Sequence, residues 1–425
     1  ERPRDAGLVA WDATGRDLAA AIKSTPRGFA LAVDDAGAVY PVTIDPTFTE
    51  AAKLTGDGVG EECAFCEFGY SVAVDGDTAV VGAHREDTAG IDSGSAYVFV
   101  RSGTAWTQEQ RLTASDGAAN DLFGVSVSVW GDTAIVGAYG DADFGANTGS
   151  AYVFVRAGTT WTEQQKLTAS GGAAGDIFGV SVAVEGDTAV VGVSGDDDLG
   201  FNSGSAYVFV RSGTVWSEEQ KLTPSDGAAL DNFGFAVSIS GDTAVVSAHL
   251  DDDLGLDSGS AYVFARSGGV WVEEQKLVAS DGAANDEFGI SLSVSGDTVV
   301  AGATGDDDLG TGSGSAYVFV RSGSVWTEEQ KLTASDAAVG AQFGVSASLS
   351  GDTVLVGAFR DDDLGNQSGS AYVLVRTGTV WTEEVKVLPE PSAASDDFGW
   401  SVSLSGDSAV VGTRFDDDVV NTAGS

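Results

Sequence analysis

The side chains best suited to chemistry are short runs of acidic residues that recur along the chain. Runs such as Asp306-Asp307-Asp308 return at a constant interval, and Glu86-Asp87 and Asp141-Ala142-Asp143 keep the same phase. Ca²⁺ takes six to eight oxygen ligands, so one such run offers two carboxylates and a carbonyl. The candidate calcium ligands are Asp141, Asp143, Asp196, Asp198, Asp251, Asp253, Asp306, Asp308, Asp361, Asp363, Asp416 and Asp418. The alternative left open is a solvated acidic rim that suits a saline habitat.

A second candidate set occupies two positions at which otherwise similar units differ. One position follows each Phe-Gly pair, and the other follows the Gly-Ala that ends the next apolar run. Binding residues usually sit on loops of a rigid scaffold, so these side chains could line a ligand pocket. They are Tyr70, His84, Tyr139, Phe235, His249, Phe359, Trp400 and Arg414. The alternative is that the aromatic side chains only fill space by packing.

The remaining reactive residue types give little support for catalysis. There are two histidines, at equivalent repeat positions, and no Gly-x-Ser-x-Gly elbow, zinc motif or phosphate-cradling loop. We therefore expect no enzymatic activity, with a glycosidase-like carboxylate pair as the least favoured alternative. The two cysteines, Cys63 and Cys66, are expected to form a local disulfide in an oxidising compartment, and two buried thiols are the alternative.

Charge and composition exclude several classes of protein. The 425 residues carry a formal net charge of −43, which argues against nucleic-acid binding and against attraction to anionic membranes. No apolar run approaches the length that a membrane-spanning helix needs. The hydrophobic fraction of 43% is too high for an acidic disordered chain, so a core is expected. The chain starts at Glu1 and lacks methionine, which we interpret as part of a longer protein.

The elements that position these side chains follow from an internal repeat. Phe-Gly occurs at Phe68 and then six more times with a 55-residue period, the last at Phe398. Each unit predicts four short strands, for example 178–184, 188–192, 206–211 and 216–222, with tight turns between the first two and the last two. We expect the Phe-Gly phenylalanines in the core and the strand-four tryptophans between sheets. The sequence thus predicts an all-β fold, a seven-bladed β-propeller of 55-residue four-stranded repeats, with a stacked solenoid as the runner-up.

The predicted organisation is a short β segment at 1–46 followed by the propeller at 47–425. The seventh unit starts at Phe398 and the chain stops at Ser425, so this unit supplies only its first two strands. Residues 50–55 match the strand-four pattern, so we expect them to help close the last blade. In a propeller, both acidic loop sets, between strands two and three and between strands four and one, lie on the same face.

The repeat resembles a known family. Phe-Gly-x-Ser-Val-x-Val-x-Gly-Asp-Thr-Ala-Val-Val-Gly-Ala, followed by Gly-Ser-Ala-Tyr-Val-Phe, is similar to the FG-GAP repeat, the unit of the integrin α-subunit propeller, in its bacterial form. The resemblance implies a secreted or cell-surface propeller used for adhesion or ligand binding. Many members bind Ca²⁺ between strands one and two, but the turn in this chain, for example Gly186-Asp187, is too short for that site.

The expected function is therefore an extracellular binding or adhesion module, assisted by Ca²⁺, with its ligand on the acidic face. A protein or carbohydrate at the cell surface or matrix is the expected partner, and we expect neither nucleic acid nor membrane insertion. The module is expected to be monomeric within a larger chain. The alternative is a structural spacer in a larger surface protein, with no ligand of its own.

Overall fold

The computed structural model describes residues 52–56, 66–389 and 393–415, together with the backbone of five strands in the first 45 residues. The chain divides into two compact units, Glu1–Lys53 and Leu54–Ser425. The first unit has a three-stranded sheet in the order β2-β1-β5 and a separate hairpin, β3-β4. Its strands are β1 (Val9–Asp12), β2 (Asp17–Leu18), β3 (Ala20–Thr25), β4 (Gly28–Val33) and β5 (Val42–Asp45).

The described residues of the second unit form six antiparallel four-stranded sheets and one two-stranded sheet. We number these sheets blades 1 to 7 in chain order. The innermost strands, with the second strand of each blade after them, are β6 (Phe68–Asp75) and β7 (Thr78–Ala83), β10 (Ser126–Trp130) and β11 (Thr133–Ala138), β14 (Val182–Glu185) and β15 (Thr188–Val193), β18 (Val237–Ser240) and β19 (Thr243–Ala248), β22 (Leu292–Ser295) and β23 (Thr298–Ala303), β26 (Ala347–Ser350) and β27 (Thr353–Ala358), and β30 (Phe398–Ser405) and β31 (Ser408–Thr413).

The third and fourth strands complete blades 1 to 6. They are β8 (Ser95–Ser102) and β9 (Ala105–Leu112), β12 (Ser150–Ala157) and β13 (Thr160–Leu167), β16 (Ser205–Ser212) and β17 (Val215–Leu222), β20 (Ser260–Ser267) and β21 (Val270–Leu277), β24 (Ser315–Ser322) and β25 (Val325–Leu332), and β28 (Ser370–Thr377) and β29 (Val380–Val387).

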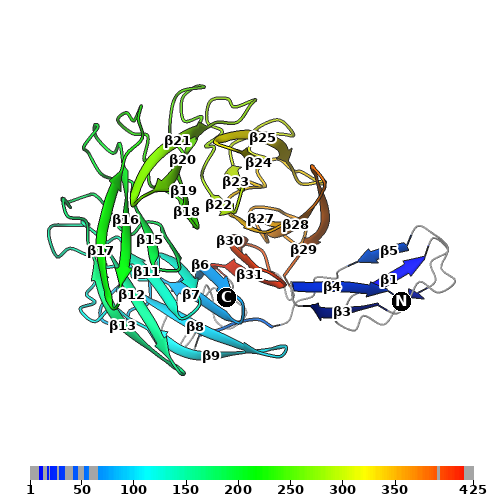
Figure 1. The fold of residues 1–425 in the computed structure, drawn as a ribbon, viewed down its shortest axis with the longest axis horizontal. Coiled ribbons are helices and arrows are strands. Elements are labelled where there is room, and N and C mark those ends of the chain that lie inside the picture. Colours follow the sequence, from blue (N-terminus) through cyan, green and yellow to red (C-terminus); the bar gives the residue numbers. More distant parts are fainter. Residues whose placement is uncertain are drawn as a thin grey trace. The chain divides into compact units, whose positions relative to one another are not determined.

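The innermost strands contact one another around a closed ring, since β30 of blade 7 packs against both β26 and β6 (Figure 1). Hydrogen bonds also close the ring, because Ser401 Oγ donates to Gly69 O at 2.8 Å and Val74 N donates to Ser403 Oγ at 2.9 Å. The propeller prediction is therefore confirmed with six complete blades and an incomplete seventh, and the solenoid alternative is wrong. The described part of the chain has no helix long and apolar enough to cross a membrane.

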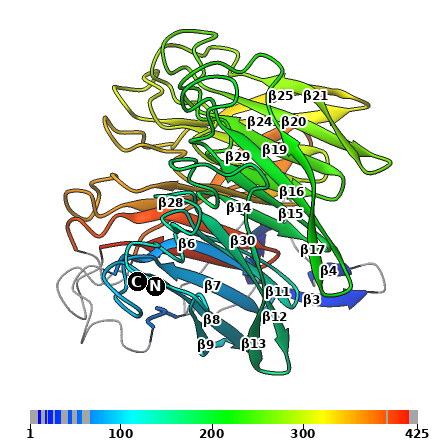
Figure 2. The same ribbon diagram turned by 90° about the vertical axis from the view of Figure 1, so that its left-hand side faces the viewer.

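The hydrophobic core lies between neighbouring blades. One buried cluster joins Val208 and Leu222 of blade 3 to Phe233, Tyr262 and Trp271 of blade 4, and comparable clusters lie at the other junctions between blades 1 and 6. The successive sheets face one another in the turned view of Figure 2. Side chains of one blade thus complete the core of the next, and the predicted burial of the strand-four tryptophans is confirmed from Trp161 onward.

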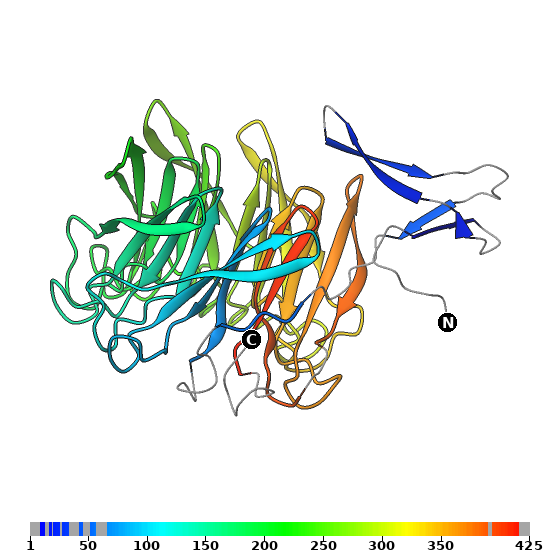
Figure 3. The ribbon, with the colours of Figure 1, turned by 90° about the horizontal axis from the view of Figure 1, so that it is seen from below.

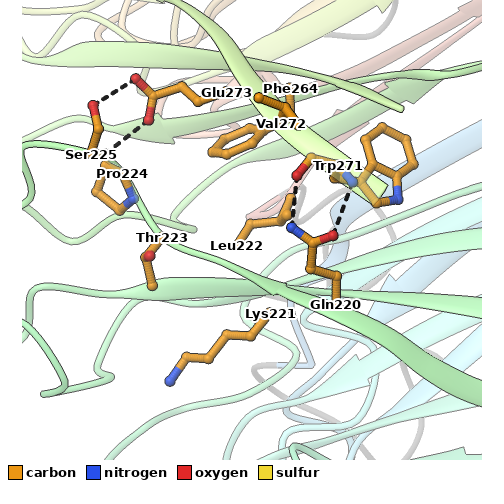
Figure 4. Close-up of a pocket in the computed structure, with 10 residues that line it drawn as sticks. All are labelled: Gln220, Lys221, Leu222, Thr223, Pro224, Ser225, Phe264, Trp271, Val272 and Glu273. Atoms are coloured by element: carbon orange, nitrogen blue, oxygen red, sulfur yellow. Dashed lines mark hydrogen bonds between the residues drawn. The ribbon is translucent and has the colours of Figure 1, made fainter. Parts of the chain in front are cut away.

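The strand-four motif of each blade directs its side chains to the neighbouring blades. A β-bulge between β16 and β17 leaves Glu219 opposite no residue of β16. Glu219 accepts a hydrogen bond from Trp271 Nε1 at 3.0 Å. Gln220 accepts a hydrogen bond from Trp271 N at 2.9 Å and donates one to Trp271 O at 2.7 Å (Figure 4). Glu273 accepts hydrogen bonds from Ser225 N and Oγ, and these two residues line a groove together with Gln220 and Trp271 (Figure 4). The groove is thus explained by blade-to-blade packing.

The prediction for the first strand needs a correction. In blades 2 to 6 the Phe-Gly pair precedes the strand, and Phe123 instead forms a parallel bridge to Gly94 of the preceding blade. Gly124 has a φ of 97°, and the equivalent Gly69 and Gly399 have φ of 88° and 89°, although in blades 1 and 7 the strand already includes the Phe-Gly pair. A Cβ on Gly124 would lie 2.3 Å from Ser95 O, so the glycine is needed for close approach of two blades. The phenylalanines are buried, as predicted.

The described part of the predicted closing segment, residues 52–55, is not a strand, but Leu54 packs against the core cluster of blade 1. Leu112 packs in the same way against the core of blade 2. The short turns between strands one and two and between strands three and four lie along one edge of the ring, and the long acidic loops lie along the other (Figure 3).

Candidate functional site

The predicted calcium ligands converge, and a lysine lies at each point of convergence. Lys331 of β25 lies with Nζ 2.8 Å from Asp281, 2.6 Å from Asp306 and 2.7 Å from Asp308. Asp306 and Asp308 come from the loop between strands two and three of the same blade, and Asp281 comes from the connection that enters the blade. Equivalent clusters surround Lys166, Lys276 and Lys386. We call each of these groups a lysine cluster.

Within a lysine cluster the two predicted ligands have different environments. The first aspartate of each pair is buried, as with Asp306 at 3% exposure, and the second is exposed. The buried carboxylate also faces a tyrosine, since Tyr317 OH lies 2.7 Å from Asp306 and 2.8 Å from Asp281. The carboxylate oxygens are therefore hydrogen-bonded as well as neutralised in part.

The ionisation of the cluster follows from these contacts. Burial raises the pKa of Asp306, but hydrogen bonds from Lys331 and Tyr317 outweigh it, so the pKa lies below its ordinary value. Burial lowers the pKa of Lys331, but hydrogen bonds to the three aspartates leave it above its ordinary value. Burial and the two hydrogen-bonded carboxylates raise the pKa of Tyr317. Near neutral pH, Asp281 and Asp306 are therefore carboxylates, Lys331 is an ammonium and Tyr317 is a neutral phenol.

Two blades depart from this composition. In blade 3, Lys221 pairs with Asp196 and Asp198 at 2.6 Å each, and Gly171 stands where other blades have the third aspartate. In blade 1 an arginine replaces the lysine, and Arg111 pairs with Glu86. Asp416 and Asp418 lie outside the described residues.

Three clusters bring carboxylate oxygens within 4.8 Å of one another and could hold a metal ion: Asp116 with Asp141 and Asp143, Asp281 with Asp306 and Asp308, and Asp336 with Asp361 and Asp363. The sequence identified two members of each set and missed the third, together with the lysine and the tyrosine. The signal was present, because Lys331 and Tyr317 also recur at the 55-residue period. The same oxygens that would ligate a metal hold the lysine ammonium.

The turn between strands one and two has its own cation. β6 ends at Asp75 and β7 begins at Thr78, so only two residues form the turn. Asp77 in that turn accepts a hydrogen bond from Arg101 Nε at 2.8 Å, and the guanidinium of Arg101 lies 5.7 Å from the ring of Trp106. The two-residue turn agrees with the interpretation that the calcium loop of many FG-GAP repeats has no room between these strands.

The second predicted set is partly brought together at the inner ends of blades 6, 7 and 1. Trp400 lies 4.9 Å from Phe359 and 5.6 Å from Tyr70, measured between ring centroids. Tyr70 lies 4.2 Å from His84, and the guanidinium of Arg414 lies 3.7 Å from the ring of Trp400. We call these five residues, Tyr70, His84, Phe359, Trp400 and Arg414, the rim group. Phe359 and His84 are buried, while Tyr70, Trp400 and Arg414 are half-buried.

Two buried carboxylates support the rim group, and the sequence interpretation missed both. Asp397 accepts a hydrogen bond from Arg414 Nε at 2.9 Å, and Glu67 pairs with Arg85 at 3.1 Å and faces His84 at 3.9 Å. Glu67 and Asp397 both precede Phe-Gly and have φ of 51° and 57°. That position varies among the units as strongly as the predicted positions do, which was the available signal.

The electrostatics of the rim group differ from those of the acidic loops. Burial lowers the pKa of His84 to about 3, and Arg85 and Arg414 act in the same direction, so the imidazole is neutral at pH 7. Burial raises the pKa of Asp397, although Arg414 opposes this. Burial raises the pKa of Tyr70, with Tyr139 and Glu67 adding to the effect. The rim group therefore combines aromatic surface with one guanidinium, that of Arg414, and no other unit has an arginine at the position of Arg414.

The other predicted rim residues lie on different blades. Phe235 and His249 form a separate pair on blade 4, with ring centroids 4.0 Å apart. Burial lowers the pKa of His249 to about 4. Tyr139 of blade 2 is half-buried and lies within electrostatic range of Glu67 and Tyr70. Cys66 is buried and disulfide-bonded, whereas Cys63 lies outside the described residues.

Comparisons with known proteins agree with the repeat. The sequence model of the FG-GAP repeat matches seven segments of the chain: residues 48–99, 106–154, 161–209, 216–264, 271–319, 326–374 and 381–425. The matched segments between 106 and 374 each run from the fourth strand of one blade to the third strand of the next. No curated protein matches the chain.

Proposed function

Because the chain belongs to the FG-GAP repeat family, we propose that its propeller is a non-catalytic binding or adhesion module of an extracellular or cell-surface protein. The propeller resembles that of the integrin α-subunit, in which the repeat supports ligand binding. The ligand contacts are assigned to the face that carries the long loops, at the rim group. A protein or carbohydrate of the cell surface or matrix is the proposed partner class.

The observation that carries this proposal is the loss of repeat symmetry at the rim group. The repeated basic side chains of strands three and four face a carboxylate in each complete blade, as Lys331 faces Asp306 and Arg101 faces Asp77. At the inner ends of blades 6, 7 and 1 the side chains instead differ, and Trp400, Tyr70 and Arg414 keep part of their surface in solvent. Aromatic and arginine side chains are enriched at the energetic centres of interfaces.

Calcium enters this proposal as an ion to be tested rather than as a resident part of the site. The carboxylates that could ligate it are present in the loops of blades 2, 5 and 6. Each of those sets already faces a lysine, so a Ca²⁺ ion would have to displace that ammonium or bind beside it. Carboxylates that are paired with a lysine bind Ca²⁺ more weakly than free carboxylates, because the ammonium and the Ca²⁺ ion repel each other.

The spacer function is the second candidate, and the paired charges favour it. The loop carboxylates are already paired with a basic side chain of the same blade, so they attract an ion or a charged partner less strongly than free carboxylates would. The two candidates differ in what they require of the rim group, since a spacer places no demand on Trp400 or Arg414.

The test is binding of the full chain to an array of glycans and extracellular matrix proteins, followed by affinity measurement with Trp400→Ala. Removing the indole takes away the platform on which the Arg414 guanidinium lies at 3.7 Å. We expect the affinity for a ligand found on the array to fall at least about tenfold.

The matched control is Val180→Ala, which changes the residue after Phe-Gly in blade 3, at the same repeat position as Trp400. It truncates an apolar side chain at the equivalent place on a blade outside the rim group, so the affinity is expected to stay unchanged. No binding anywhere on the array, or equal losses in both variants, would refute the rim group as the ligand site and favour the spacer.

A further inference from the structure

We propose that the strand-four lysine is the resident cation of the acidic loops, so that the propeller holds these loops in place without Ca²⁺. The family resemblance and the runs of aspartate both suggest calcium. The described clusters instead provide their own positive charge. This inference does not depend on which ligand the rim group binds.

The lysine geometry meets the needs of the carboxylates. An ammonium has three donors, and in blades 2, 4, 5 and 6 it faces three aspartates at 2.5 to 2.9 Å. The charged end lies 5.1 to 5.3 Å from the ring of the blade's own tyrosine in these blades. The tyrosine thereby holds the ammonium over the cluster while its hydroxyl bonds the buried aspartate.

A Ca²⁺ ion would need the same space. Ca²⁺ binds oxygen ligands at about 2.3 to 2.6 Å, which is close to the separation of Nζ from the same oxygens. The ion would therefore lie almost on top of Nζ if it used all three carboxylates. For the ion to bind, the lysine ammonium must first move away. The buried aspartate then loses its contact with the ammonium before the ion takes that place.

The variation among blades shows which component is constant. Each of the six complete blades has a basic side chain at the lysine position, five lysines and Arg111. The number of acids is not constant, because blade 3 has Gly171 in place of the third aspartate and still keeps Lys221 paired with two. A site for a divalent ion requires its carboxylates and leaves no room for a fixed cation. In these blades the basic side chain is always present and the number of carboxylates varies.

The experiment compares the full chain with Lys331→Gln and Lys221→Gln in low-salt buffer, with EDTA or with millimolar CaCl₂. Thermal unfolding and calorimetric calcium titration are the readouts. For the unaltered chain we expect the same unfolding midpoint in EDTA and in CaCl₂. A ligand raises the midpoint only when its concentration exceeds its dissociation constant for the native state. Lys331→Gln leaves three carboxylates without a cation, so its midpoint in EDTA should fall by about 2–4 °C and recover on addition of CaCl₂.

Lys221→Gln is the matched control, since it removes a lysine from a cluster with two aspartates. It should lose stability in EDTA but recover less on addition of calcium. Asp281→Gly gives blade 5 the composition of blade 3, and it should change the midpoint equally in EDTA and in CaCl₂. A loss seen only in CaCl₂ would overturn the proposal, so this variant decides the test if Lys331→Gln does not fold.

Three further results would overturn the proposal. One is stoichiometric calcium binding by the unaltered chain, and another is a midpoint of the unaltered chain that EDTA lowers. The third is a Lys331→Gln variant that folds and gains no calcium response.

Discussion

Blade 4 contains a natural exchange of two residues that predicts how the blade junctions are packed. In blade 3, Ser181 Oγ donates to Gly234 O of the next blade at 2.8 Å, and Gly192 lies beneath that carbonyl. A Cβ on Gly192 would lie 1.9 Å from Gly234 O and 2.2 Å from Ser181 Oγ. In blade 4 the equivalent residues are Ala236 and Ser247, so the hydroxyl has moved from one strand to the other.

The exchange in blade 4 satisfies the moved hydroxyl locally. Ser247 Oγ accepts from Ala236 N at 2.9 Å and donates to Ala236 O at 3.4 Å. The next blade has moved away slightly, because a Cβ on Gly289 would lie 2.8 Å from Ser260 O where the equivalent distance is 2.2 to 2.3 Å in the junctions at Gly124, Gly179, Gly234, Gly344 and Gly399. The Ser181 hydroxyl holds the Gly234 carbonyl over Gly192, and this position of the carbonyl leaves no room for a Cβ on Gly192. The serine and the glycine are therefore expected to change together.

The perturbation is Gly192→Ser, alone and combined with Ser181→Ala. The single change must break the Ser181 hydrogen bond, worth about 1 kcal/mol, and overpack the junction at about 1–3 kcal/mol. Its total cost in free energy of unfolding is therefore about 2–4 kcal/mol. Ser181→Ala alone should cost about 1 kcal/mol. The double variant reproduces the blade 4 pair and should cost no more than Ser181→Ala.

The assay is urea unfolding of the four proteins followed by fluorescence, read as a double-mutant cycle. We expect a favourable coupling of about 2 kcal/mol or more, well above the scatter of roughly 0.3–0.5 kcal/mol between independent sites. If the double variant were as unstable as the sum of the singles, the hydroxyl would not control the carbonyl position. The reasoning about blade packing would then be refuted.

Three further predictions follow from other contacts. Gln220→Ala removes both hydrogen bonds to the Trp271 backbone and should cost about 1–3 kcal/mol in urea unfolding; an unchanged midpoint would contradict the contact. Gly124→Ala should destabilise by more than about 3 kcal/mol because its Cβ meets Ser95 O, whereas Gly131→Ala, with positive φ but open space, should cost about 1–2 kcal/mol; equal losses would contradict the steric argument. Burial raises the pKa of Asp231 to about 6, above its unfolded value, so the folded protein binds this proton more tightly and gains stability as the pH falls from 7 toward 4. Asp231→Asn should remove that gain, and an unchanged difference between unfolding midpoints at pH 7 and pH 5 would count against it.

The sequence determined the architecture of this protein because its signals are local and repeated. The 55-residue period, the two-residue turns and the alternation within segments such as 178–184 predict four strands per unit, and the number of units predicts the ring. The sequence also predicted the residues of the acidic loops, because they repeat with that period. It predicted the rim group because those side chains differ from unit to unit at otherwise equivalent positions. The start of strand one was predicted too early in blades 2 to 6, where the strand begins after the Phe-Gly pair.

Only the tertiary structure decided which cation the acidic loops bind and which residues of the rim group contact one another. Strand β24 separates Lys331 from Asp308 along the chain, and β22, β23 and β24 separate it from Asp281. Their convergence therefore depends on strand pairing within the blade and on the path of the connection that enters it. Trp400 and Tyr70 are far apart in the chain and meet because the ring closes. Charge counted along the sequence cannot show that a carboxylate is already paired, since pairing is a property of distance in the folded chain.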